Sequence, residues 1–142
     1  MTTANLTIVR KIMTYANIRI LLVDDERQFI DTLAQRLIMR GFSPRVVYSG
    51  EAALVALKEP TDIVLLDLRM TGMDGFEVLS TLTKCNPTIK IIILTGHGAD
   101  AEEQTAYRMG AFNFLRKPVD IDELLQSIRM AVQEKTEEVC QD

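Results

Sequence analysis

The strongest constraint on the fold comes from short, nearly unbroken apolar runs that each stop at a polar side chain. Three runs stop in this way: residues 63–66 at Asp67, residues 18–23 at Asp24 and Asp25, and residues 89–94 at Thr95. Runs of Ile, Val and Leu of this length are typical of strands buried on both faces of a parallel sheet. Because a buried carboxylate is costly, we expect these polar residues at the carboxyl ends of the strands, where open α/β sheets bind ligands.

From residue 18 onward, strand-like runs alternate with segments in which apolar residues recur at helical spacing. Strands are expected at residues 18–23, 44–48, 62–67, 89–95 and 112–115. This alternation predicts a doubly wound, five-stranded parallel sheet with helices on both faces. A chain of 142 residues that is 47% hydrophobic fits one domain with a substantial core.

The segments between the strands carry helix caps, and one helix stands out by its thin apolar face. Gly41 is a candidate C-cap residue, and Ser49 and Asp120 are candidate N-caps. The helix expected at residues 100–109 offers only Ala101, Ala106 and Met109 to the core. Such a face buries little area, so we expect this helix to be the most easily displaced.

We expect a flexible N-terminal extension at residues 1–17, a folded domain at residues 18–135 and a charged C-terminal tail at residues 136–142. The apolar residues of the extension also permit a short amphipathic helix. No apolar run approaches the roughly 18 residues of a membrane span, and the first residues lack the apolar core of a secretory signal. A cytoplasmic protein is the simplest expectation.

Charge and cysteine content exclude some classes of function. The net charge of −4 and the isoelectric point near 5.1 argue against a nucleic-acid surface, which needs clustered Lys and Arg. Cys85 and Cys140 lack the spacing of metal ligands, and two free thiols fit a reducing compartment.

Three aspartates at neighbouring strand ends, Asp24, Asp25 and Asp67, cannot all stay ionised unless a positive group lies among them. Mg²⁺ bound by a few carboxylates and waters fits this need, particularly beside a phosphoryl group. Lys117 follows the fifth strand and adds a fixed positive charge, and Thr95 adds a hydroxyl. The set favours phosphoryl transfer with Asp67 as the nucleophile.

These residues resemble the receiver domains of two-component response regulators. The matching positions are Asp24-Asp25, Asp67 within Leu66-Asp67-Leu68-Arg69-Met70, the segment Gly72-Met73-Asp74-Gly75, Thr95, and Lys117-Pro118. The resemblance covers residues 18–135. It implies a flavodoxin-like strand order, 2-1-3-4-5, and a cis peptide before Pro118. It also implies a signalling domain that promotes only its own phosphorylation and dephosphorylation.

The resemblance assigns a role to each site residue. Asp67 would be phosphorylated by the phosphohistidine of a sensor kinase or of a histidine phosphotransfer protein. Asp25 and Asp67 would ligate Mg²⁺ directly, Asp24 chiefly through water, and Arg69 through its backbone carbonyl. Lys117 would pair with the phosphoryl oxygens.

The resemblance also implies a conformational switch. Thr95 would move toward the phosphoryl group, and Phe114 would swing inward behind it. This movement would alter the surface made by the fourth helix, the fifth strand and the fifth helix, where a partner or a second copy binds in relatives.

The chain departs from its relatives at several positions. Thr71 stands where many relatives have proline, which would leave the loop after Asp67 less rigid. Phe114 replaces a common tyrosine and has no hydroxyl to anchor either of its positions. Arg69 and His97 occupy positions that tune the lifetime of the phosphorylated state in the family.

Other interpretations remain beside this one. Asp24 and Asp25 could be ordinary helix caps, and a flavin site would need glycine or serine where the first strand meets these acids. The main alternative is a phosphoryl-transfer enzyme that forms an aspartyl phosphate on a small substrate. Such enzymes usually carry an acid/base aspartate two residues after the nucleophile, where this chain has Arg69. A receiver-like domain that only binds partners is a third possibility.

Overall fold

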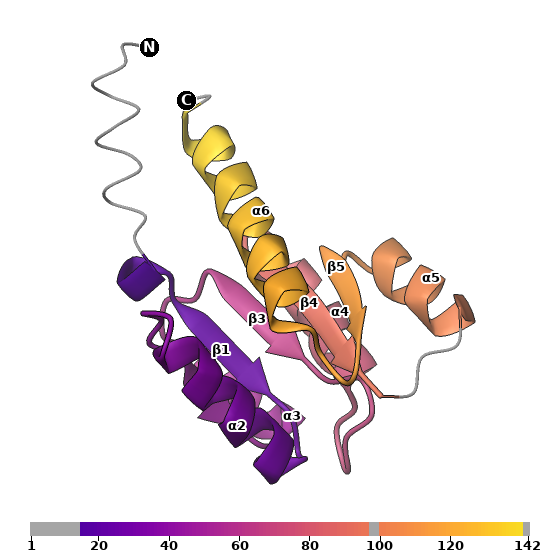
Figure 1. Cartoon of the computed structure of the whole chain (residues 1–142). Coiled ribbons are helices and arrows are strands. Elements are labelled where there is room, and N and C mark those ends of the chain that lie inside the picture. Colours follow the sequence, from indigo (N-terminus) through magenta and orange to yellow (C-terminus); the bar gives the residue numbers. More distant parts are fainter. Residues whose placement is uncertain (1–14, 97–99, 141–142) are drawn as a thin grey trace.

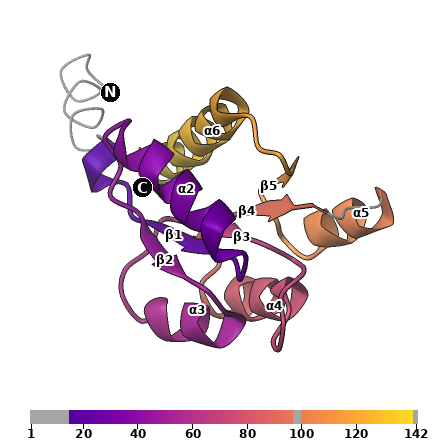
Figure 2. The same cartoon turned by 60° about the horizontal axis from the view of Figure 1, so that its bottom comes forward.

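The computed structural model describes residues 15–96 and 100–140, and its strands form one parallel sheet in the order β2-β1-β3-β4-β5 (Figures 1 and 2). The strands are β1 (Ile20–Val23), β2 (Arg45–Val47), β3 (Ile63–Leu66), β4 (Lys90–Thr95) and β5 (Asn113–Arg116). The predicted doubly wound sheet and its flavodoxin-like order are confirmed. The strands β1, β2 and β3 are each two residues shorter than the sequence patterns suggested, β4 is one residue shorter, and β5 has the expected length but is shifted by one residue.

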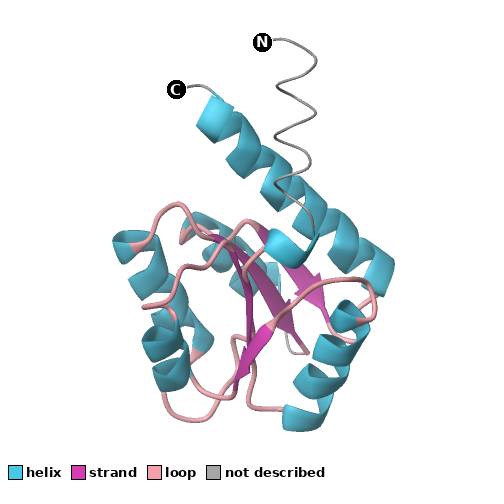
Figure 3. Ribbon diagram, turned by 90° about the vertical axis from the view of Figure 1, so that its left-hand side faces the viewer, coloured by secondary structure: helices cyan, strands magenta, loops and turns pink. Residues whose placement is uncertain are grey.

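Helices cover both faces of this sheet (Figures 2 and 3). They are the 3-10 helix η1 (Tyr15–Asn17) and the helices α2 (Arg27–Ile38), α3 (Gly50–Ala56), α4 (Gly75–Cys85), α5 (Asp100–Arg108) and α6 (Ile121–Cys140). The core cluster on one face draws on α2 and α6, and the cluster on the other face draws on α3, α4 and α5. All residues of β1 and β3 are buried, as expected for strands covered on both sides.

The register of the strands places their carboxyl ends at one edge of the sheet. Val23 of β1 pairs with Leu66 of β3, and Leu66 pairs with Ile93 of β4. The residues that follow Val23 and Leu66 are Asp24 and Asp67, so the two aspartates leave adjacent strands at the same level. The strand register therefore brings the backbones of Asp24 and Asp67 side by side, whatever the conformations of their side chains.

Most of the predicted helix caps are present. The Ser49 side chain accepts a hydrogen bond from the N–H of Ala52, and Asp120 accepts from the first turn of α6. Gly41 has φ of +95°, a left-handed conformation that favours glycine. Helix α5 has a single buried residue, Ala106, which confirms its thin apolar face.

The regular structure extends past both limits that the sequence suggested. The ring of Tyr15 stacks on Phe42 with centroids 4.5 Å apart, three residues before the expected start of the domain. Helix α6 continues to Cys140, beyond residue 135. The expected character of residues 1–14 lies outside the described residues. Cys85 is exposed and free.

Two smaller observations complete the fold. The peptide between Lys117 and Pro118 is cis, as the resemblance implies. In the part of the chain that the structure describes, no helix is both long enough and apolar enough to cross a membrane.

Candidate functional site

Asp24 and Asp67 form the centre of the site because the sheet holds their backbones. The N–H of Asp67 donates to the carbonyl of Val23 at 3.0 Å, and the N–H of Asp24 donates to the carbonyl of Val47 at 3.3 Å. Each aspartate thus continues a strand ladder by one residue. Their exposures are only 1% and 2%, so both carboxylates are buried at the mouth of the sheet.

Lys117 supplies the positive charge that we expected among the aspartates. Its Nζ lies 2.7 Å from Asp24 Oδ2, 3.7 Å from Asp67 Oδ2 and 3.1 Å from Glu26 Oε1. The ammonium also lies 4.4 Å from the centre of the Phe29 ring, a favourable cation–π distance. With a side chain 9% exposed, Lys117 is a buried counter-charge and not a solvated lysine.

Burial and charge shift the pKa values of two site residues. Desolvation and the negative charge of Asp24 raise the pKa of Asp67 to about 7, although Lys117 and the N–H of Arg69 act in the opposite direction. Desolvation tends to lower the pKa of Lys117, but its hydrogen bond to Asp24 and the charge of Asp67 outweigh burial and raise it. A carboxyl that titrates near neutrality in a cleft is a common mark of a functional group.

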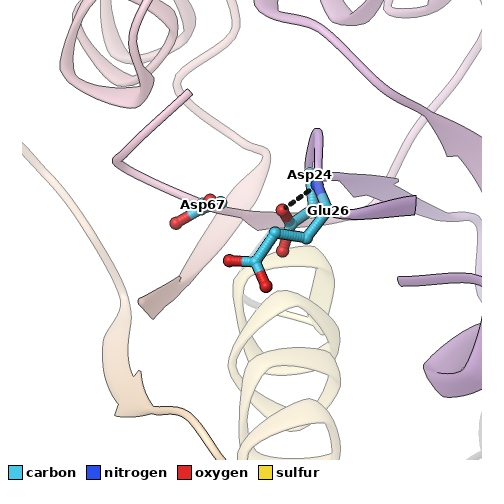
Figure 4. A group of neighbouring side chains, drawn as sticks. All are labelled: Asp24, Glu26 and Asp67. Carbon is cyan, nitrogen blue, oxygen red and sulfur yellow. Dashed lines mark hydrogen bonds between the residues drawn. The ribbon is translucent and has the colours of Figure 1, made fainter. Parts of the chain in front are cut away.

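Three carboxylates are close enough to share a cation. Among the described residues, Asp24, Glu26 and Asp67 each offer an oxygen within 4.8 Å of the other two (Figure 4). Oxygen donors of this kind suit Mg²⁺. The pKa of Asp67 is raised first by burial and then by the charge of Asp24, and a cation beside these oxygens would favour the ionised carboxylate. The residues therefore fit the expected metal.

Glu26 was missed by the sequence-based prediction. Its only sequence signal is that it directly follows the acidic pair, and its side chain is mostly exposed. Its N–H donates to Asp24 Oδ1 at 2.9 Å (Figure 4), so Asp24 holds the residue before α2 with one oxygen and binds Lys117 with the other. The N-cap residue of α2 is Glu26, and α2 has no side-chain cap, so the interpretation of Asp24 as an ordinary helix cap is wrong.

Asp25 lies outside the three-carboxylate group. Its Oδ2 accepts hydrogen bonds from the N–H and the hydroxyl of Thr71, at 2.9 and 3.2 Å. The resemblance implied that Asp25 is a direct metal ligand, and in this structure its carboxylate faces the loop after β3.

Arg69 connects the site to α5. Its N–H donates to Asp67 Oδ1 at 3.3 Å, while its guanidinium forms an ion pair with Glu102. The pair joins the loop after β3 to the first turn of α5. The predicted metal contact of the Arg69 carbonyl stays a prediction.

Of the two predicted switch residues, Thr95 lies beside the site and Phe114 lies in the core. Thr95 is fully buried at the end of β4, and its carbonyl accepts from the N–H of Lys117 at 2.9 Å. Phe114 is 6% exposed and belongs to the core, so its ring already occupies the inward position. His97 lies outside the described residues.

Gly75 explains how the loop after β3 returns so close to the site. A Cβ at this position would lie 2.2 Å from the carbonyl oxygen of Asp67 and 2.5 Å from the Cα of Leu68. The N–H of Gly75 donates to the carbonyl of Leu68 at 3.0 Å. Only glycine permits this approach of the first turn of α4 to the backbone of Asp67.

Comparisons with known proteins agree on one family. The model of the response regulator receiver domain matches residues 20–129. The transcriptional regulatory protein GlrR of Escherichia coli (strain K12) is 38% identical over 123 residues, which are 86% of this chain and 28% of that protein. The photosynthetic apparatus regulatory protein RegA of Rhodovulum sulfidophilum is 35% identical over 112 residues, which are 77% of this chain and 60% of RegA.

Solved structures agree with the sequence comparisons. The receiver domain protein (CheY-like) from Methanospirillum hungatei JF-1 superposes with a TM-score of 0.81 at 28% identity, covering 85% of this chain and 98% of that one. The receiver domain of NtrX from Brucella abortus has a TM-score of 0.76 at 31% identity, covering 80% and 98%. The similarity thus spans whole receiver domains, whereas the chain spans less than a third of GlrR.

Proposed function

Because this chain belongs to the family of response regulator receiver domains, we propose that Asp67 is its phosphoacceptor. The phosphoryl donor is the phosphohistidine of a sensor kinase or of a histidine phosphotransfer protein. One observation carries the proposal: Asp67 is buried at the carboxyl edge of the sheet, with Asp24 and the Lys117 ammonium beside it. This arrangement offers a nucleophilic oxygen and a cation on the same side of the strand ends.

The reaction moves one phosphoryl group. A carboxylate oxygen of Asp67 forms a bond to phosphorus while the bond between phosphorus and the donor imidazole nitrogen breaks, and the imidazole retains that electron pair. Asp67 must be ionised to attack, so its pKa near 7 makes the cation important for reactivity at neutral pH.

Mg²⁺ would be held by Asp24, Asp25, Asp67 and the carbonyl of Arg69, and when bound it neutralises charge on the phosphoryl oxygens. Lys117 already lies 3.7 Å from Asp67 Oδ2, so its ammonium can exchange one carboxylate partner for a phosphoryl oxygen. This exchange keeps the lysine paired throughout the transfer.

The signal leaves the site through Thr95 and the surface of α5, β5 and α6, while Phe114, whose ring is already buried, needs no further inward swing. The attachment of α5 by one buried residue and by ion pairs makes this helix easy to reposition. We propose this surface as the contact for an output partner or a second copy in a homodimer. Elution volume with and without beryllofluoride, a phosphoryl mimic, tests the dimer.

Three broader assignments accompany this function. The proposed receiver domain spans residues 18–135, with an extension at residues 1–17 whose last residues form the 3-10 helix η1, and a tail at residues 136–142 that α6 enters as far as Cys140. The protein acts in the cytoplasm, where its kinase partner presents phosphohistidine. It is a signalling domain that turns over only its own phosphoryl group.

The assignment is tested by labelling with acetyl phosphate in the presence of Mg²⁺. The wild-type protein is expected to gain one phosphoryl group, and Asp67→Asn is expected to gain none. Asp62→Asn is the matched control, because Asp62 is also buried but pairs with Arg19 at the opposite end of the same strand. Full labelling of Asp67→Asn would refute the assignment.

The alternative of a phosphoryl-transfer enzyme has less support. The position two residues after Asp67 holds Arg69, whose side chain pairs with Glu102 and offers no acid/base carboxyl. The compared proteins are regulators or receiver domains. Repeated turnover of a small phosphoester by the wild type, lost in Asp67→Asn, would favour the enzyme.

A further inference from the structure

One residue, Thr71, fastens the loop after β3 to the loop after β1. Its N–H and its hydroxyl both donate to Asp25 Oδ2, at 2.9 and 3.2 Å. The two residues are 46 positions apart in the sequence, so this contact depends on the fold. Hydrogen bonds to an ionised carboxylate are stronger than neutral ones and fix its orientation.

Asp25, the acceptor of both hydrogen bonds from Thr71, is not one of the three carboxylates that could share a cation. Among the described residues, the oxygens of Asp24, Glu26 and Asp67 approach one another within 4.8 Å, and Asp25 is not part of that set. For its carboxylate to join that set, Asp25 must therefore move closer to Asp24 and Asp67. That movement competes with both hydrogen bonds from Thr71.

The loop has a second attachment that does not involve Asp25. The N–H of Met73 donates to Glu51 Oε1 at 3.2 Å, which ties the same loop to α3. Loss of the Glu51 contact would loosen the loop and leave Asp25 in place. The two attachments can therefore be separated by experiment.

Resting on the function proposed above, we propose that Thr71 is a positioning residue that holds Asp25 away from the metal-binding carboxylates. Binding of Mg²⁺ then exchanges the hydrogen bonds between Asp25 and Thr71 for contact between Asp25 and the cation. The exchange lowers the affinity for Mg²⁺. It also releases the loop that follows Asp67 when the metal binds.

The test measures Mg²⁺ affinity by isothermal titration calorimetry. Thr71→Pro removes both donors, because proline has neither N–H nor hydroxyl, and the Kd for Mg²⁺ should fall about fivefold. Thr71→Ala keeps the N–H, and its Kd should fall about twofold. Thr71→Ser keeps both donors and should match the wild type. Thermal unfolding confirms that each variant is folded.

A second readout follows the Thr71 amide directly. Hydrogen exchange at the Thr71 N–H should accelerate when Mg²⁺ is added to the wild type, because its acceptor leaves. The control Glu51→Ala loosens the loop through Met73 and should leave the Kd for Mg²⁺ unchanged.

The possible outcomes separate this inference from the proposed function. A Kd in Thr71→Pro that is unchanged or higher overturns the role of Thr71, as does an equal fall in Glu51→Ala. In either case labelling of the wild type at Asp67 would leave the proposed function standing. Failure of the wild type both to bind Mg²⁺ and to accept a phosphoryl group would refute the proposed function itself.

Discussion

Asp67 faces two opposed requirements, since it must be ionised to act as a nucleophile and is almost wholly buried. Burial and the neighbouring carboxylate of Asp24 favour its protonated form, whereas Lys117 favours the charged form. The balance leaves the pKa of Asp67 at about 7. A bound cation would shift the balance toward the nucleophile, so metal binding and readiness for phosphorylation are coupled at this one residue.

We therefore predict that Asp67 titrates near pH 7 in the metal-free protein, instead of near its ordinary value of 3.8. Carbon-13 NMR of the aspartate carboxyls, assigned by comparison with Asp67→Asn, measures this directly. Added Mg²⁺ should lower the midpoint, because a nearby cation stabilises the carboxylate. A midpoint near 4 without metal would contradict the prediction.

The same shift predicts how stability depends on pH. Because the pKa of Asp67 is higher in the folded protein than in the unfolded chain, the folded state binds more protons between pH 4 and 7. Its contribution to stability is present at low pH and is lost as the pH rises through 7. Asp67→Asn does not titrate, so its stability relative to wild type should rise with pH. The difference in the free energy of unfolding between variant and wild type, measured by urea unfolding, should be larger at pH 8 than at pH 4.5 by more than about 1 kcal/mol. An equal difference at both pH values would exclude this linkage.

Gly75 is the second residue whose identity the site demands. Gly75→Ala places a Cβ within 2.5 Å of the backbone at Asp67 and Leu68, so α4 must shift. We expect a loss of about 2–3 kcal/mol in the free energy of unfolding. Gly96→Ala is the matched control, since its Cβ would meet nothing nearer than 3.9 Å. Equal stability of both variants would show that the loop adapts without strain.

At the residue scale, the sequence predicted the site residues that lie at strand ends and missed the contacts that depend on loops. Asp24, Asp67 and Thr95 were predictable because each follows an apolar run, and Lys117 because it follows the fifth strand. Glu26 ends near the same cleft through a long, exposed side chain, which no periodicity signals. The hydrogen bonds from Thr71 to Asp25 depend on the conformation of two loops, so they could not be predicted from the sequence either.

At the scale of elements, α5 differs from the other helices in how it is held. Its apolar contribution to the core is limited to one buried residue. Ion pairs compensate: Glu102 pairs with Arg69, and Asp100 and Glu103 lie 3.4 and 3.3 Å from Arg116. Charged contacts of this kind can be exchanged at little cost, which suits an element that transmits a signal from the loop after Asp67.

We predict that Glu102→Gln loosens α5 without unfolding the protein. Loss of the ion pair with Arg69 should speed hydrogen exchange across residues 101–108 about threefold, since a partly exposed pair contributes up to about 1 kcal/mol. Hydrogen exchange with mass spectrometry provides the measurement.

Two variants separate the ion pair from other effects on the helix. Glu123→Gln occupies the same place in the first turn of α6, so it controls for the change in charge at a helix start. In an Arg69→Gln background, Glu102→Gln should have little further effect. A full effect in that background would assign the change to something other than the pair.

The elements were predictable because strand burial on two faces and helix burial on one leave different periods in the sequence. The five strands were placed to within two residues at each end. The contact between Arg69 and Glu102 was not predictable, because it joins residues 33 positions apart through side chains that lie on the surface.

At the scale of the whole molecule, Lys117 connects the two ends of the fold. Its hydrogen bond to Asp24 spans 93 residues and joins the end of β5 to the end of β1, across β3 and β4. The carboxylates that repel each other at this edge are held by a single ammonium. Folding of the sheet therefore brings together two carboxylates and one ammonium, and burial of the carboxylates depends on the ammonium.

Because the buried carboxylates depend on the ammonium of Lys117, we predict the effect of Lys117→Met, which keeps the length of the side chain and removes its charge. Asp24 and Asp67 would remain buried without their counter-charge, and the free energy of unfolding should fall by about 3 kcal/mol. Lys58→Met, at an exposed position in the turn after α3, should cost less than about 0.5 kcal/mol. Because a divalent cation can replace the ammonium, millimolar Mg²⁺ should restore more stability to Lys117→Met than it adds to the wild type. An equal gain from Mg²⁺ in both proteins would mean that Lys117 and the metal do not neutralise the same carboxylates.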